Sequence, residues 1–112
     1  MQNSLTPFQE ACERRLISGL PAEFALADRE VKGSKEHYIY AKIPSREIEI
    51  WIYVDEAMFS ASGKSFVYER PDYPDAEKRI AVFVGAVLAC VAGKEPMDKG
   101  SARMNLFRGR KI

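Results

Sequence analysis

The chain has 112 residues, of which 46% are apolar and 29% charged, and its formal net charge is +1. A chain of this length buries a core without needing disulfides or metals, and the apolar fraction excludes a disordered protein. The longest apolar run, residues 80–92, is shorter than the roughly 17 to 25 residues that a membrane-spanning helix needs. The first residues lack the basic and apolar regions of a signal peptide. We therefore expect a cytoplasmic protein with no membrane contact.

The segment that begins at Thr6 predicts a helix. Thr6 and Gln9 have the spacing of a capping box, and Pro7 suits the first helical position. Apolar residues follow at intervals of three and four up to Leu16, and the pattern closes at Ser18-Gly19. We expect a short amphipathic helix.

Two segments in the middle of the chain alternate apolar and polar residues with a period of two. Residues 48–55 have the β-branched alternation of a strand with one buried face, and residues 37–43 alternate in the same way. A four-residue loop, 44–47, joins them into an antiparallel hairpin, because residues opposite each other must point to the same side of the sheet. This loop pairs Ile43 with Ile48, Ala41 with Ile50 and Ile39 with Ile52 towards the core, and Lys42 with Glu49, Tyr40 with Trp51 and Tyr38 with Tyr53 on the other face.

Two further strands flank this hairpin in the sequence. Residues 24–32 predict a strand with a bulge near Asp28, and residues 64–70 predict a strand that follows a loop over residues 59–63. The alternation leaves open which side Phe66 and Tyr68 face.

A second helix is predicted to start within residues 72–77, where acidic groups meet the positive end of the helix dipole, and to end at Gly93. Its apolar residues at helical spacing form a stripe that we expect to pack on a sheet. Because the opposite face of this helix is apolar too, we expect the helix to be central in the fold or covered by the first helix or by a second subunit. Residues 1–93 therefore predict one α+β domain with two layers and the order α-β-β-β-β-α. We expect a four-stranded antiparallel sheet with both helices on one face.

The remaining segment, 94–112, differs in charge from the domain. It holds six basic and two acidic residues, a net charge of +4, whereas residues 1–93 hold eleven basic and fourteen acidic residues, a net charge of −3. We expect a basic and flexible C-terminal tail.

No motif in the chain names a reaction. His37 is the only histidine, so one chain cannot build a multi-histidine metal site. Cys12 and Cys90 lie on the apolar sides of the two predicted helices, which favours buried thiols over a catalytic thiolate. Gly63-Lys64-Ser65 resembles the end of a phosphate-binding loop, but Met58 stands where the motif needs its first glycine. We expect no catalytic residue, metal or cofactor.

The aromatic residues of the hairpin are the strongest functional signal. Four rings and one pair of opposite charges share the sheet face that the helices leave open, namely Tyr38, Tyr40, Trp51, Tyr53, Lys42 and Glu49. Aromatic anchors inside a polar rim are typical of protein-binding surfaces. The alternative is that the rings only stabilise the sheet or lie under the chain's own termini. We predict a non-enzymatic protein-interaction module of inhibitor, immunity or adaptor type, whose partner is another protein or a second copy of itself.

Two alternative functions remain open. Sheet aromatics can also stack the bases of single-stranded nucleic acid, with phosphates bound by basic residues of the tail, Arg103, Arg108, Arg110 and Lys111. The net charge of −3 on residues 1–93 opposes this reading. The third possibility is a small enzyme of unknown reaction that uses His37.

Overall fold

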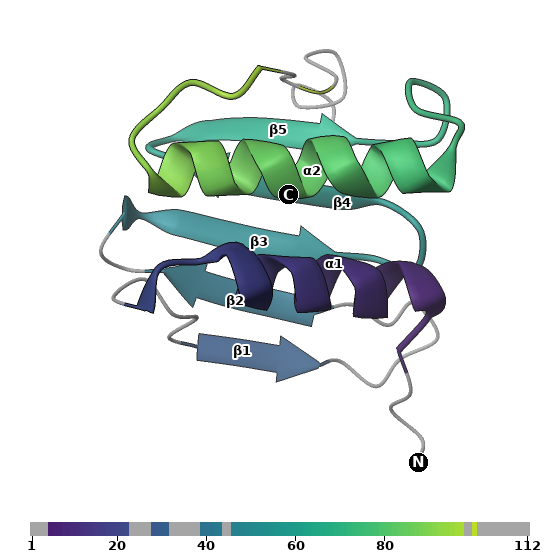
Figure 1. Ribbon diagram of the computed structural model, residues 1–112, viewed down its shortest axis with the longest axis horizontal. Helices are drawn as coiled ribbons and strands as arrows, with labels where there is room; N and C mark the ends of the chain where they lie inside the picture. Colours follow the sequence, from purple (N-terminus) through teal and green to yellow (C-terminus); the bar gives the residue numbers. More distant parts are fainter. Residues whose placement is uncertain (1–4, 23–27, 32–38, 44–45, 98–99, 101–112) are drawn as a thin grey trace.

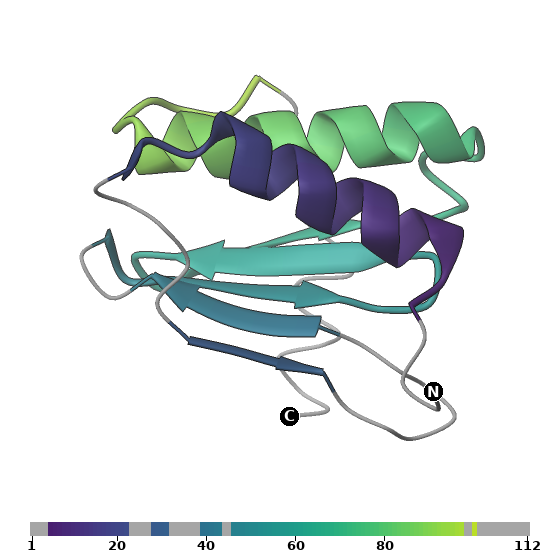
Figure 2. The same cartoon turned by 60° about the horizontal axis from the view of Figure 1, so that its bottom comes forward.

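A computed structural model describes residues 5–22, 28–31, 39–43, 46–97 and 100 of the chain. The elements in chain order are α1 (Pro7–Gly19), β1 (Asp28–Val31), β2 (Ile39–Ile43), β3 (Ile48–Ile52), β4 (Ala57–Ala61), β5 (Lys64–Tyr68) and α2 (Ala76–Val91). The strands form one antiparallel sheet in the order β1-β2-β3-β4-β5. Both helices lie on one face of this sheet (Figures 1 and 2). The predicted two-layer α+β class is confirmed.

The capping box predicted at the start of α1 is present and also anchors the helix to the sheet. The backbone N–H of Gln9 donates to Thr6 Oγ1 at 3.1 Å, and the Thr6 N–H donates to Gln9 Oε1 at 2.9 Å. The same Thr6 hydroxyl and the amide nitrogen of Gln9 also bind the chain at the end of β3. Thr6 Oγ1 donates to the Val54 carbonyl at 2.7 Å, and Gln9 Nε2 donates to the Ile52 carbonyl at 3.1 Å. The cap therefore fixes where α1 begins on the sheet.

The second helix begins and ends where the sequence predicts. Asp75 is the N-cap and accepts from the Lys78 N–H at 3.3 Å, and Gly93 follows the C-cap with a φ of 80°. Gly93 suits this place because a positive φ ends helices at low cost only for residues without a Cβ. Among the described residues, no helix is long and apolar enough to cross a membrane.

The predicted register of the central hairpin is confirmed. Between β2 and β3, Ile43 pairs with Ile48 and Tyr40 pairs with Trp51, and the other pairs follow in step. The predicted pairing of Tyr38 with Tyr53 lies outside the described residues. The pairs of β1 with β2 run without interruption from Asp28 to Val31, so the bulge expected near Asp28 is not present there.

The sheet contains one strand more than the sequence predicts. The segment expected as a loop before residue 64 is β4, which pairs with β3 on one side and β5 on the other. A two-residue turn, Ser62 and Gly63, joins β4 to β5, with φ angles of 53° and 84°. Two positive φ angles in a two-residue hairpin loop match the right-handed twist of the adjoining strands.

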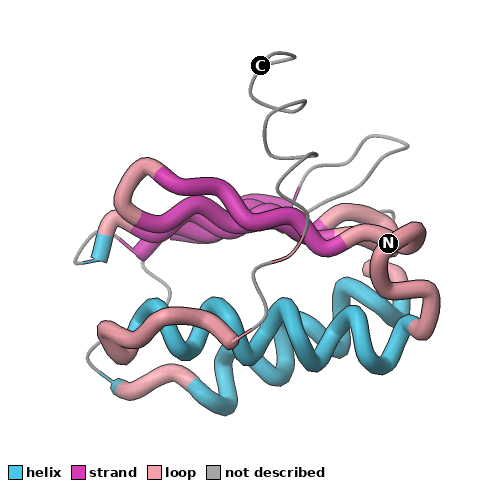
Figure 3. The backbone as a smooth tube through the Cα atoms, turned by 90° about the horizontal axis from the view of Figure 1, so that it is seen from above, coloured by secondary structure: helices cyan, strands magenta, loops and turns pink. Residues whose placement is uncertain are grey.

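The core lies between the helices and the sheet (Figure 3). Phe59, Tyr68 and Phe83 are fully buried there, with the Phe83 ring edge-on to both others at 6.2 and 5.8 Å between centroids. Phe66 stacks on Phe59 at 4.8 Å. The undecided orientation of Phe66 and Tyr68 is thereby resolved, since both face the helices. The two helices approach closely at Gly19, where an added Cβ would lie 2.6 Å from Leu88.

Candidate functional site

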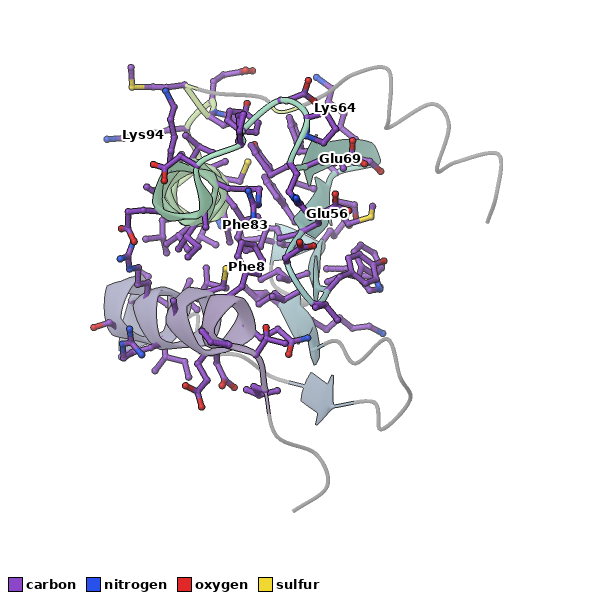
Figure 4. All side chains as sticks on the ribbon, turned by 90° about the vertical axis from the view of Figure 1, so that its right-hand side faces the viewer. Phe8, Glu56, Lys64, Glu69, Phe83 and Lys94 are labelled. Atoms are coloured by element: carbon purple, nitrogen blue, oxygen red, sulfur yellow. The ribbon has the colours of Figure 1, made fainter. Side chains whose placement is uncertain are left out.

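The sheet face turned away from both helices, called the outer face, carries the residues that alternate with the core. The register places Lys42, Glu49, Ser60 and Ser65 in one row across β2 to β5, and Tyr40, Trp51, Met58 and Val67 in the next. Tyr53 and Glu69 follow Trp51 and Val67 by two positions, which keeps them on the same face. Figure 4 shows Glu69 on this side of the sheet, with Phe8 and Phe83 on the other.

Four of the six residues predicted to bind a partner have described side chains. Trp51, Tyr53, Lys42 and Glu49 are all half-buried. The backbone register places Tyr40 opposite Trp51, and Tyr38 lies outside the described residues. The structure therefore brings the described members of the predicted set together on one face, over β2 and β3.

An open hollow of about 320 Å³ adjoins this set. Its polar lining comes from Lys42, Glu47, Glu49 and Ser60. These groups supply one cation, two carboxylates and a hydroxyl, which can donate and accept hydrogen bonds at the rim of a contact. Trp51 lies in the next row of the sheet. Polar groups of both charges around an aromatic residue are typical of protein–protein interfaces.

The part of the outer face over β4 and β5 is different. Met58 is 4% exposed, Val67 1% and Glu69 6%, although neither helix lies on this side. Gly100 lies against the backbone of β5, the last strand of the sheet, because an added Cβ there would be 2.3 Å from the Val67 carbonyl oxygen. This half of the outer face is covered, whereas Trp51 and Tyr53 remain partly accessible.

A second hollow, of about 350 Å³, lies between the C-terminal end of α2 and the β4–β5 turn. Arg46, Lys64 and Lys94 surround its apolar lining, which includes Phe66 and Cys90. The cations suit an anionic group, but Glu95 also lines the hollow and lowers the local positive charge. The sequence does not reveal this hollow, because its lining comes from three separate segments of the chain.

The two cysteines are unsuited to nucleophilic chemistry. Cys12 is fully buried, and burial raises the pKa of its thiol to about 12 against the opposing effect of Arg15 and Arg79. Burial, and then the charge of Glu95, also raises the pKa of the Cys90 thiol. Both thiols are protonated at neutral pH, and the thiolate is the reactive form.

Arg79 is a buried cation that the sequence pattern did not reveal. It is 3% exposed; its Nε donates to the Asp55 carbonyl at 2.8 Å and its guanidinium donates to the Tyr73 carbonyl at 2.7 Å. The guanidinium also lies 5.3 Å from the centre of the Phe8 ring, a cation–π distance. Arg79 thus joins α1, α2 and the β3–β4 turn, and its role is structural.

His37 and the basic residues Arg103, Arg108, Arg110 and Lys111 lie outside the described part of the chain. Within the described part, no three His, Cys, Asp or Glu side chains gather as metal ligands.

Searches of family models, of curated proteins and of solved structures find no match to this chain.

Proposed function

We propose that this domain is a non-enzymatic protein-interaction module that binds through the outer face over β2 and β3. The proposed contact residues are Trp51, Tyr53, Lys42 and Glu49, together with Tyr38 and Tyr40. The observation that carries the proposal is the position of Trp51, which is half-buried on the face without helices, in the row next to Lys42, Glu49 and Ser60, which line a polar hollow.

The chemistry of the surface favours a protein as the partner. Tryptophan and tyrosine are enriched among the residues that contribute most to binding energy, and a surrounding polar rim excludes water from them. Here Lys42 and Glu49 supply that rim with both signs of charge. The partner is either another protein, in which case the domain acts as an inhibitor, immunity protein or adaptor, or a second copy of this chain.

Charge on the same face argues against nucleic acid. A surface that tracks phosphates needs an excess of cations, but Lys42 lies opposite the carboxylate of Glu49 and lines one hollow with Glu47 and Glu49. A nucleic-acid complex would have to draw its affinity from Arg103, Arg108, Arg110 and Lys111, and it would weaken steeply with salt.

The test compares two substitutions of apolar side chains on opposite sides of the molecule. Trp51→Ala removes the proposed anchor, and Ile17→Ala removes an apolar side chain of α1 that is 55% exposed. Light scattering gives the oligomeric state of each full-length variant, affinity capture followed by mass spectrometry gives its partners, and circular dichroism confirms that it folds.

We expect Trp51→Ala to remain folded and to lose either dimerisation or the specific partner, while Ile17→Ala retains both. Equal behaviour of the wild type and Trp51→Ala in both measurements contradicts the proposal. Binding to an oligonucleotide at low salt that disappears at high salt would favour the nucleic-acid alternative instead.

A further inference from the structure

The hollow of about 350 Å³ beside the C-terminal end of α2, called the end hollow, lies where the layer between helices and sheet ends. Phe66 and Ala61 line it and are only half-buried, although both pack against the core. Apolar surface of the core face is therefore accessible at this end. The volume falls within the range of roughly 300 to 1,000 Å³ that small-molecule sites occupy.

Lys64 occupies the position where the core face of β5 would continue. Lys64, Phe66 and Tyr68 alternate onto the same face of the strand, and the two aromatic residues pack against the core. Lys64 pairs with Ala61 across the β4–β5 hairpin, and both residues line the end hollow. The end hollow thus combines an apolar floor with a cation at its edge.

Two further cations reach the end hollow from other segments of the chain. The guanidinium of Arg46 lies near the end of α2, because an added Cβ on Gly93 would be 3.8 Å from Arg46 Nη1. Lys94 follows Gly93, and in Figure 4 it lies beside α2, whereas Lys64 lies beside the sheet. Three cations together with the carboxylate of Glu95 give the lining a formal charge of +2.

The carbonyls at the end of α2 are already hydrogen-bonded within the chain. The Ala89 carbonyl accepts from the Lys94 N–H at 2.8 Å, and the Cys90 carbonyl accepts from the Gly93 N–H at 3.0 Å. Neither Lys64 nor Lys94 forms an ion pair with another described residue. The two lysines are therefore available to an anion. Arg46 can join them, because a guanidinium has five N–H donors and can serve more than one acceptor.

We propose that the end hollow binds a small organic carboxylate with an apolar body. The carboxylate lies towards Lys64 and Arg46, whose planar guanidinium matches it in geometry, and the apolar part lies against Phe66 and Ala61. The site is on the helix side of the sheet, whereas the proposed partner surface is on the outer face. Each proposal can therefore fail while the other stands.

NMR titration of the full-length chain tests this site. The probes are octanoate, its neutral counterpart octanamide, and inorganic phosphate, which carries charge without an apolar body. The methyl group of Ala61 reports on the end hollow, and that of Ala57, on the same face at the other end of β4, is the matched reference. We expect octanoate to shift the Ala61 resonance saturably and to bind about ten times more tightly than either other probe, because charge-assisted hydrogen bonds and apolar contact act together.

Two variants connect this binding to the proposed contacts, followed at the Gly93 amide. Lys64→Gln should weaken octanoate about threefold, as expected for one exposed charge, and Ala61→Leu should abolish binding because the larger side chain fills the end hollow. The matched controls, Lys78→Gln and Ala81→Leu, change exposed residues of α2 outside the end hollow and should bind like the wild type.

Three results would overturn the proposal. The first is the absence of a saturable shift at Ala61 in the wild type. The second is an affinity for octanoate no higher than that for octanamide or phosphate. The third is wild-type affinity in Lys64→Gln, whose substituted side chain is exposed, so that circular dichroism should show an unchanged fold.

Discussion

The two faces of the sheet are formed by the same strands, but their side chains differ in polarity and burial. Towards the helices, the side chains of Ile50, Phe59 and Tyr68 are fully buried. On the outer face, Trp51 and Tyr53 are half-buried and share the surface with Lys42 and Glu49. The contrast teaches that hydrophobic burial on the inner face accounts for the fold, whereas the aromatic rings of Trp51 and Tyr53 lie outside the core between helices and sheet.

The largest expected effect lies on the inner face. Phe83→Ala removes a fully buried ring that contacts Phe59 and Tyr68, and it leaves a cavity between α2 and the sheet. We expect a loss of about 4 kcal/mol in the free energy of unfolding. Urea denaturation followed by circular dichroism measures it, and a loss below that of Trp51→Ala would break the comparison.

The next effect concerns the buried cation that joins the two layers. Arg79→Met keeps the length of the side chain but leaves the carbonyls of Asp55 and Tyr73 without their donor. We expect a loss of about 3 kcal/mol in unfolding free energy, because buried acceptors lose their hydrogen bonds. Arg79→Lys should recover only part of it, since an ammonium cannot reproduce the fork of the guanidinium. Full recovery in the lysine variant would show that charge alone matters.

The buried thiol on the inner side gives a pH dependence. The pKa of Cys12 is raised by burial from 9.0 to about 12, so the folded state keeps a proton that the unfolded state releases. The stability this provides is complete below pH 9 and is lost as pH rises towards 12. We expect a loss of about 1.4 kcal/mol per pH unit within this window. Unfolding free energies at pH 8 and 10 measure it, and Cys12→Ala should have the smaller slope.

The smallest effect is expected on the outer face. Trp51→Ala removes a half-buried ring whose cross-strand contacts stabilise the sheet by about 1 kcal/mol. Urea denaturation of this variant beside Phe83→Ala sharpens the comparison. A loss as large as that of Phe83→Ala would mean that Trp51 belongs to the core, and the case for a binding surface would fail.

The central part of the fold follows from sequence because burial imposes a strict pattern on it. Alternation of isoleucine from Ile48 to Ile52 sets one face of β3, and a shift of one residue would turn that face to water. The register of β2 with β3, and hence the shared face of Lys42, Glu49 and Trp51, follows from this pattern alone.

The sequence pattern does not predict β4, and the reason is physical. Ala57, Met58 and Phe59 are buried in succession because both faces of β4 are covered, so the segment shows no alternation. The signal that could have found it is the Ser62-Gly63 pair, which sits between two strand-length segments and forms a two-residue hairpin turn.

The remaining features depend on contacts between distant parts of the chain. In the sequence, Arg79 has the pattern of a solvated charge in the first turn of a helix. In the structure its Nε donates to the carbonyl of Asp55, 24 residues earlier, and the side chain is buried. The sequence likewise predicts a solvated side chain for Glu69, at the end of a strand. Its burial, and the approach of Gly100 to Val67, arise from tertiary arrangement that no local pattern encodes.

The most direct test of the binding surface is site-specific photo-cross-linking in cells that express the full chain. A photoreactive residue at Ser60 probes the outer face beside Glu49, and one at Ile17 probes the helix layer. We predict a discrete protein adduct from position 60 that disappears when Trp51→Ala is added, and no such adduct from position 17. An adduct from position 17 alone, or one from position 60 that survives Trp51→Ala, would contradict a binding surface centred on Trp51.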